Sequence, residues 1–396
     1  MNSTLVRGEA QSFRWDRVTA ASALAYCVLV TGLSTGLVLG ELRDQLHLSG
    51  TVTALHGCTF GVGMLVAATF GDRAVARFGR ARVFWTACVS IIVGLIVFCI
   101  GTVVAVTLFG ATIAGFSAAA VVLVQPGLIA DHHGENRSAA FAAVNAYPAL
   151  CGVTVAVAIG LAIGADVSWR WTFFAFGTTI LAALLVIGRH AALPKARVTN
   201  AAPAWRMLRD PVIRRAWGNL TIAIMVEFPI AVWATVYLKE VGGSSNGAAP
   251  ILSSTFGLMM FCSRLLMPAL HRRLEGRLRE WALAGTGLGA VLLWAMPSLP
   301  GKVMALAMVG FAAGPLYTTS VDRMYAVAPG TDAQGMGALA ALASGTAVTT
   351  APLALGMIAD IVGLRLAVLI VPVLAGVALL MRFRQERAAV PATATA

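Results

Sequence analysis

The residue in this sequence that is best placed to do chemistry is Glu227. It lies at the midpoint of the apolar segment AWGNLTIAIMVEFPIAVWATVYL, which is bounded by Arg215 and Lys239. At a helical rise of about 1.5 Å per residue, Glu227 is roughly 18 Å from either flanking charge, which is the middle of a bilayer. An ionised carboxylate at that depth costs at least about 2.5–3.5 kcal/mol. Glu227 is therefore expected to face a cavity, to find a partner or to take up a proton.

Two neighbours in the same segment bear on the role of Glu227. Pro229 cannot donate a backbone hydrogen bond, so polar backbone groups are left free beside the carboxylate, as is typical of a helix that lines a cavity. We interpret Glu227 as a proton-coupling and substrate-binding residue; the alternative is a structural carboxylate that hydrogen-bonds to a neighbouring helix. Trp233 is a further candidate binding residue, but it lies about 120° around the helix from Glu227, which leaves open whether the two share a cavity.

Other polar residues inside apolar segments are candidates for substrate binding. Arg264 lies eight residues before Arg272, hence roughly 12 Å inside the membrane boundary. It is a candidate contact for an anionic substrate; the alternative is that it snorkels, or pairs with Asp322 or Glu227. Four more candidates, each more typical of helix packing than of ligand binding, are His56, Gln125, Asn145 and Tyr147.

The composition indicates a polytopic membrane protein. Of 396 residues, 59% are hydrophobic and only 12% are charged, which exceeds what a soluble domain of this size needs. Apolar runs of about 20 residues predict twelve transmembrane helices, near 18–40, 51–71, 83–101, 104–130, 140–164, 171–188, 216–238, 248–270, 281–297, 303–321, 335–359 and 366–381. The predicted fold class is an all-α membrane protein.

The basic residues lie mostly on one side of the predicted bundle. Of the 29 Lys and Arg residues, 23 fall in the termini and the even-to-odd loops and 5 in the opposite loops, while Arg264 lies within a span. Because cytoplasmic loops carry the excess of Lys and Arg, both termini are predicted to be cytoplasmic. This distribution also accounts for the net charge of +12 without a nucleic-acid partner.

The longest polar stretch divides the predicted spans six and six. Residues 189–215 include three prolines and seven Lys or Arg residues, which is typical of a solvated loop near anionic headgroups. The domain prediction is a six-helix half at 1–188, a cytoplasmic linker at 189–215 and a second six-helix half at 216–396.

Nothing in the sequence is typical of an enzyme or of a metal site. All six cysteines fall within predicted spans, where they behave as small apolar residues. His132 and His133 are followed by Glu135 but by no further converging ligands, so a solvated loop is predicted there and no metal. A phosphate-binding glycine loop with Lys-Ser/Thr is missing, which argues against coupling to ATP. We predict no cofactor.

The two halves repeat some features in the same order. The second span is followed by DRAVARFGRAR and the eighth by HRRLEGRLR, and each contains Gly-Arg-x-Arg. The fourth span ends at Asp131, and the tenth reaches Asp322. Transporters are commonly built from such repeats, with the substrate site at their interface.

These motifs resemble the major facilitator superfamily over essentially the whole chain. The family's signature loop between helices two and three reads Gly-x-x-x-Asp-Arg-x-Gly-Arg-basic-Arg. Its second half is matched here by Arg77, Phe78, Gly79, Arg80 and Arg82. Its first half departs, because Ala76 replaces the Asp and Asp72 replaces the opening Gly; whether Asp72 substitutes for that Asp is left open.

The resemblance implies a set of gating residues. In the family the loop arginine pairs with an acidic residue at the cytoplasmic end of helix four and latches the outward-open state, and Arg80 and Asp131 occupy those places. Arg277 and Asp322 are the corresponding residues of the weaker second copy. The full set of gating candidates is Arg77, Gly79, Arg80, Arg82, Asp131, Arg277 and Asp322.

Two patterns of proton-driven exporters in that family are not matched. Ala111 stands at the position of the expected helix-four arginine, and AYPALCG (146–152) replaces the Gly-Pro motif of helix five. The prediction is nevertheless a secondary active transporter of the cytoplasmic (inner, plasma) membrane, with proton-coupled efflux of a drug or metabolite by antiport as the leading function. The alternatives are proton-coupled uptake of a small nutrient or organic anion, and a non-transporting receptor or scaffold. The predicted partners are a small-molecule substrate, protons and the lipid bilayer, and the predicted oligomeric state is a monomer.

Overall fold

The structure is a bundle of helices. The computed structural model describes residues 14–134, 137–194, 204–274, 276–327 and 333–389, and it contains no strand within these ranges. In chain order its elements are α1 (Arg17–Leu33), η1 (Ser34–Val38), α2 (Leu39–Leu46), α3 (Gly50–Phe78), α4 (Arg80–Ile100), α5 (Val104–His133), α6 (Arg137–Gly164), α7 (Trp169–Gly188), η3 (Ala204–Arg209), α8 (Pro211–Glu240), α9 (Ala248–Leu265), α10 (Met267–Arg273), α11 (Leu278–Ala295), α12 (Leu299–Ala326), α13 (Ala333–Val362), α14 (Leu364–Ala367) and α15 (Ile370–Ala389).

Local capping residues define where several helices begin. The side chain of Asp16 accepts a hydrogen bond from the backbone N–H of Thr19, and Ser49 caps α3 in the same way. Asp210 caps α8, whose first residue is Pro211, a position where the missing backbone N–H costs nothing. Helix α8 therefore begins inside the stretch that was predicted as the linker 189–215.

Eleven helical segments among the described residues are long and apolar enough to cross a membrane. Each corresponds to one of the twelve predicted spans. The remaining predicted span, 281–297, corresponds to α11, which carries the charged residues Arg279 and Glu280 in its first turn. Helix α11 still packs beside α12 and α15 within the bundle. The number of twelve membrane-crossing helices stays a prediction.

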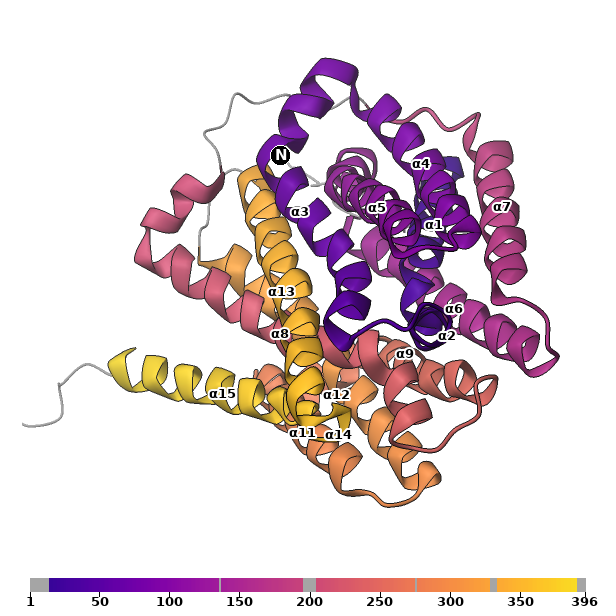
Figure 1. Cartoon of the computed structure of the whole chain (residues 1–396). Coiled ribbons are helices and arrows are strands. Elements are labelled where there is room, and N and C mark those ends of the chain that lie inside the picture. The colour runs from indigo at the N-terminus through magenta and orange to yellow at the C-terminus, as the bar shows by residue number, and fades with distance from the viewer. Residues whose placement is uncertain (1–13, 135–136, 195–203, 275, 328–332, 390–396) are drawn as a thin grey trace, which may run out of the picture.

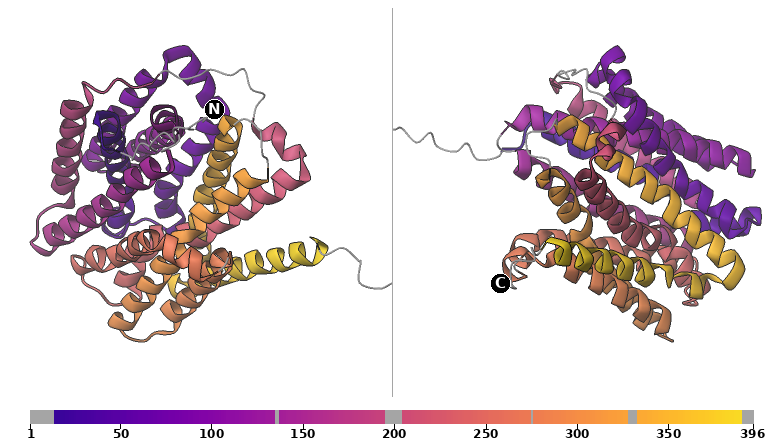
Figure 2. Two further views of the ribbon diagram at one scale, coloured as in Figure 1. Left: turned by 180° about the vertical axis from the view of Figure 1, so that it is seen from behind. Right: turned by 90° about the vertical axis from the view of Figure 1, so that its left-hand side faces the viewer.

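The helices α1 to α7 and α8 to α15 form two groups that lie side by side (Figures 1 and 2). We call them the N half and the C half. They meet mainly where α3 packs against α13 and where α6 packs against α9. Each of these pairs joins the second long helix of one half to the fifth long helix of the other. This exchange is the relation expected of two repeated units.

Glycine is required where these helix pairs come closest. A Cβ atom on Gly61 of α3 would lie 2.5 Å from the backbone nitrogen of Thr349 in α13. A Cβ atom on Gly160 of α6 would lie 2.5 Å from the carbonyl oxygen of Gly247, just before α9. Both distances are well below normal contact, so only a hydrogen at these positions lets the backbones approach.

Connections between successive long helices alternate between two ends of the bundle. The Lys239 end contains the end of α8 at Glu240, the start of α3 at Gly50 and the turn at Gly363. The Arg80 end contains the turns at Gly79 and Gly276 and the end of α5 at His133. Gly79, Gly276 and Gly363 have φ values of +83°, +79° and +83°, a backbone conformation that glycine adopts without strain.

Candidate functional site

The structure brings together two of the residues that were predicted to bind substrate, Glu227 and Arg264. Arg264 Nη2 of α9 lies 3.9 Å from Glu227 Oε1 of α8, and the two side chains are 34% and 14% exposed. At this separation the two groups form an ion pair but not a hydrogen bond. Arg264 is positioned from the other side by its Nε, which donates to the carbonyl oxygen of Gly314 in α12 at 3.3 Å. The pair therefore lies among three helices of the C half.

The hydrogen-bonding capacity of the second carboxylate oxygen of Glu227 is unused among the described residues. Glu227 Oε2 is buried and has no hydrogen-bond partner among the described residues. Pro229 lies inside α8 two residues later, so the helix ladder lacks one donor beside the carboxylate. Buried polar atoms are nearly always satisfied in folded proteins. An acceptor left in this way is suited to a proton, a water molecule or a polar group of a ligand.

His56 is also placed near the interface of the halves, but not beside Glu227. A cavity of about 40 Å³ between the halves is lined by His56 of α3, by Gly36 of η1, and by Phe228 and Val232 of α8. It is large enough for water and too small for an organic solute in this conformation. Glu227 does not line it, so the predicted site residues fall into at least two separate places.

Both ring nitrogens of His56 are engaged in hydrogen bonds. Nδ1 donates to the carbonyl oxygen of Val52 at 3.1 Å, and Nε2 lies 3.0 Å from Thr107 Oγ1 of α5. Gln125 is fully buried, and its Nε2 donates to the carbonyl oxygen of Ser22 at 2.8 Å, which ties α5 to α1. In this conformation both side chains cross-link helices of the N half.

The other three candidate binding residues are Trp233, Asn145 and Tyr147. Trp233 is buried and its Nε1 donates to the carbonyl oxygen of Pro352 in α13 at 3.1 Å. Asn145 and Tyr147 lie on an exposed part of α6. The ring of Tyr147 meets the ring of Trp15 edge to face, with centroids 5.2 Å apart.

The pairing of Arg80 with Asp131 that the family resemblance implied is present. Arg80 Nη1 donates to Asp131 Oδ2 at 2.7 Å, with side chains that are 10% and 32% exposed. The same nitrogen also donates to the carbonyl oxygens of Gly127 and Pro194, at 3.5 and 3.4 Å. Every one of these partners belongs to the N half or to the chain segment that follows it. In this conformation the pair fastens α4 to α5 and does not bridge the two halves.

The remaining gating candidates occupy the surface of the Arg80 end. Arg77 and Arg82 are exposed, and Arg77 stacks over the ring of Phe78 at 5.6 Å. Gly79 supplies the left-handed turn between α3 and α4.

The second copy of the motif is built differently from the first. Arg277 is exposed, and the side chain of Asp322 lies outside the described residues, so their pairing stays a prediction. Arg279 is buried instead, and it donates to Ser320 Oγ and to the carbonyl oxygen of Asn219, each at 3.1 Å. A nearby ion pair, which the sequence did not indicate, joins Arg323 to Glu280 at 3.0 Å.

A polar cluster at the start of α1 was also missed by the sequence reasoning. A carboxylate oxygen of Asp16 and ring nitrogens of His132 and His133, which are atoms that could bind a metal ion, lie within 4.8 Å of one another. They are already hydrogen-bonded, because His132 Nε2 contacts Asp16 Oδ2 and Thr19 Oγ1 lies 2.9 Å from His133 Nε2. Burial would raise the pKa of Asp16, but the hydrogen bonds from His132 and Thr19 outweigh it and lower that pKa to about 2. The cluster ties the start of α1 to the end of α5; Glu135 lies outside the described residues.

The comparisons with known proteins agree on one family and one fold. A family model described as Major Facilitator Superfamily matches residues 19–329. A bacterial homologue of the human lysosomal transporter Spinster, solved in an inward-facing, occupied conformation, superposes with a TM-score of 0.73 at 14% identity, over 93% of this chain and 96% of that chain. The human organic anion transporter MFSD10 (TETRAN) superposes with a TM-score of 0.65 at 16% identity, over 93% of this chain and 100% of that chain. No sequence among the curated proteins matches this chain.

Proposed function

Because this chain belongs to the major facilitator superfamily, a family of membrane transporters and not of enzymes, we propose that it is a proton-coupled secondary transporter of a small organic solute. The two helix groups would rock against each other and expose a site near their interface to one side of the membrane at a time. Glu227 is the proton-coupling residue in this proposal.

The observation that carries the proposal is the incomplete environment of the Glu227 carboxylate. One oxygen lies 3.9 Å from Arg264, and the other is buried without a hydrogen-bond partner among the described residues. An added proton would turn the unpartnered oxygen into a neutral O–H group and end the attraction to Arg264. Loss of the proton would restore that attraction. Protonation therefore changes which groups hold α8 to α9, and a proton can bias a two-state equilibrium only through such a difference.

The substrate in this proposal is a drug or metabolite that carries a polar or charged group. Glu227 offers a negative charge and Arg264, one third exposed, a positive one, so the pair can orient a molecule that bears either sign. Export is the proposed direction. Uptake of an organic anion is the second candidate, and the accessible guanidinium of Arg264 favours it, because guanidinium groups bind carboxylates well.

We propose that the Arg80 end faces the cytoplasm and that the protein lies in the cytoplasmic membrane. The support is electrostatic, because Arg77, Arg80, Arg82 and Arg277 all lie at this end and cytoplasmic ends carry the excess of basic residues. The Lys239 end would then face outward.

The test is transport by the purified protein in proteoliposomes that contain a pH-sensitive dye. A panel of cationic, zwitterionic and anionic solutes is offered with and without a pH gradient. For the solute that is moved, Glu227→Gln should abolish uphill transport driven by the pH gradient but retain exchange at equal pH, since Gln keeps the size and polarity without titrating. Glu280→Gln is the matched control, because it removes another C-half carboxylate, at the Arg80 end, and should retain uphill transport.

Three results would contradict the proposal in different ways. Uphill transport by Glu227→Gln at the wild-type rate would eliminate Glu227 as the coupling residue. Solute flux through the wild-type protein that does not depend on the pH gradient would eliminate proton coupling. Reproducible binding of a solute without any flux would favour a receptor or scaffold.

A further inference from the structure

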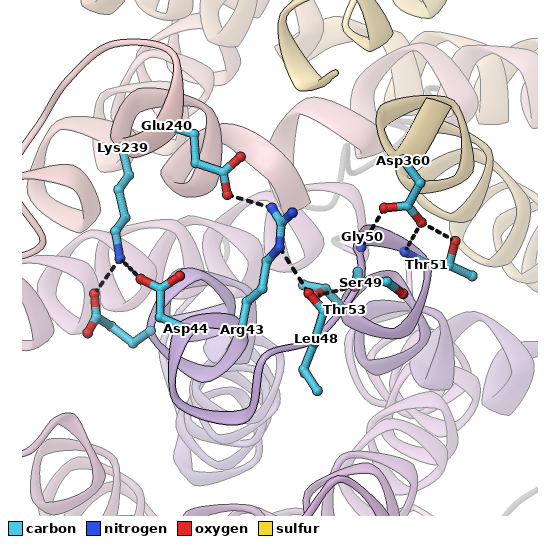
Figure 3. Close-up of polar contacts among 11 residues, drawn as sticks. Arg43, Asp44, Leu48, Ser49, Gly50, Thr51, Thr53, Lys239, Glu240 and Asp360 are labelled. Carbon is cyan, nitrogen blue, oxygen red and sulfur yellow. Dashed lines mark hydrogen bonds and ion pairs between the residues drawn. The ribbon is translucent and has the colours of Figure 1, made fainter. Parts of the chain in front are cut away.

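We infer that three contacts between the halves at the Lys239 end form a clasp that holds this end of the protein closed. Figure 3 shows their residues, which come from α2 and α3 of the N half and from α8 and α13 of the C half. The inference rests on the proposed function in one respect only, namely that opening of this end is part of a transport cycle.

The first contact is a carboxylate of the C half that caps a helix of the N half. Asp360 Oδ1 accepts from the backbone N–H of Gly50 at 2.7 Å, and Oδ2 accepts from the backbone N–H and the hydroxyl of Thr51 at 2.8 and 2.5 Å. The first N–H groups of a helix have no partner within the helix, and the helix dipole favours a negative charge there. Asp360 therefore satisfies groups of α3 that the N half leaves open.

Gly50 makes this cap sterically possible. A Cβ atom at this position would lie 2.6 Å from Asp360 Oδ1 and 3.1 Å from the carbonyl oxygen of Gly356. Any larger residue would have to displace the carboxylate or separate α3 from α13. The contact therefore requires the negative charge of Asp360 in the C half and the lack of a side chain at Gly50 in the N half.

The second contact places a lysine of the C half between two acidic residues of the N half. Lys239 Nζ lies 2.6 Å from Asp44 Oδ2 and 3.1 Å from Glu41 Oε1. Both carboxylates are carried by α2, which is separated from α1 by the 3-10 turn η1. The side chains of Lys239 and Glu41 are each 18% exposed, so this pair is better shielded from water than a typical surface pair.

The third contact reverses the signs of the second. Arg43 Nη1 of α2 lies 2.5 Å from Glu240 Oε1 at the end of α8. Arg43 Nε also donates to the carbonyl oxygen of Leu48 at 3.2 Å, which holds the guanidinium in place. Adjacent residues of α2 and adjacent residues of α8 thus pair with alternating charge, so sliding α8 along α2 would bring like charges together.

The Arg80 end is held together differently. There the ion pairs Arg80–Asp131 and Arg323–Glu280 each stay within one half. Besides the clasp, a bond from Cys58 Sγ to the carbonyl oxygen of Thr349 at 3.1 Å also joins the halves. Weakening the clasp should therefore release the Lys239 end selectively.

The experiment measures the distance between spin labels on the full-length protein in lipid nanodiscs, without substrate. Labels at Val167 and Ser298 report on the Lys239 end, because these exposed residues lie in turns of the N half and the C half there. Labels at Arg73 and Arg273 report on the Arg80 end. Only Cys151 and Cys262 need replacement beforehand, since the other four cysteines are buried.

Three variants and one control test the clasp. Asp360→Asn keeps the shape but removes the charge, Gly50→Ala pushes the carboxylate away, and Glu240→Arg places like charges together. Each should raise the ratio of the open to the closed population at the Lys239 end, measured from the label distances, by about tenfold, because one set of charge-assisted bonds is lost. Asp166→Asn is the matched control, since Asp166 is an exposed carboxylate in the turn that follows α6 at the same end, and it should change nothing.

Charge exchange guards against a merely unfolded variant. Arg43→Glu combined with Glu240→Arg restores opposite charges and should return the distances toward those of the wild-type protein. The clasp is refuted if Asp360→Asn, Gly50→Ala and Glu240→Arg all give the distances of Asp166→Asn, or if the charge exchange fails to reverse the effect of Glu240→Arg. Opening without any solute transport would retain the clasp and refute the proposed function. Solute transport by the wild-type protein, with no opening of the Lys239 end in the three variants, would refute the clasp and retain the proposed function.

Discussion

Asp131→Asn should destabilise the protein without changing how its two halves are arranged. The bond at stake joins Arg80 Nη1 to Asp131 Oδ2 at 2.7 Å, between side chains that are 10% and 32% exposed. A hydrogen bond to a charged group contributes about 1.5–3 kcal/mol, whereas an exposed ion pair contributes about 0–1 kcal/mol. Because Asp131 is about one third open to water and Arg80 keeps the carbonyl oxygens of Gly127 and Pro194, we expect a loss of about 1–2 kcal/mol.

A double-mutant cycle measures this value. Asp131→Asn, Arg80→Gln and the double variant are unfolded reversibly in mixed detergent micelles, and Arg82→Gln serves as a control because Arg82 is exposed in the same first turn of α4. A coupling free energy below about 0.5 kcal/mol would show that the pair contributes nothing measurable. The spin-label distances between the halves should stay at wild-type values, since the bond lies within the N half. A change in those distances would instead support the latch of the outward-open state that the family resemblance implied.

Two further predictions concern packing and pH. Gly61→Ala should lower the free energy of unfolding by about 1–3 kcal/mol, because its Cβ atom would lie 2.5 Å from the backbone nitrogen of Thr349. Gly218→Ala in α8 is the control, because Gly218 has open space around it, and it should be neutral or slightly stabilising. Equal effects of the two changes in the unfolding assay would contradict the close packing at Gly61. Asp16→Asn should lower the melting temperature at neutral pH, and this difference should disappear as the pH falls from about 4 to about 2, because the pKa of Asp16 in the folded protein is lowered to about 2 and its ionised form then stabilises the fold only above that range. A difference that persists at pH 2 would show that the charge of Asp16 is not responsible.

The sequence alone was enough to predict the membrane class, the helical fold and the family. Hydropathy works for this purpose because a bilayer requires long apolar helices whose backbone groups are all satisfied internally. The Gly-Arg-x-Arg loop identified the family, and the pairing of Arg80 with Asp131 followed from it. The weakest span was α11, because its first turn carries Arg279 and Glu280 and its place in the bundle depends on neighbouring helices.

Only the tertiary structure decided which polar residues meet. Glu227 was conspicuous in sequence because burying a carboxylate is costly, and pairing with it was one of the alternatives open for Arg264, but nothing in the spacing ruled out Asp322 as its partner. Trp233, six residues from Glu227, turned out to bond Pro352 of α13 instead. The clasp at the Lys239 end was beyond sequence reasoning, because Gly50 and Asp360 are 310 residues apart and an acidic residue at a helix end has many possible partners. Local patterns specify how each helix forms, whereas partners across the interface depend on how the two halves pack.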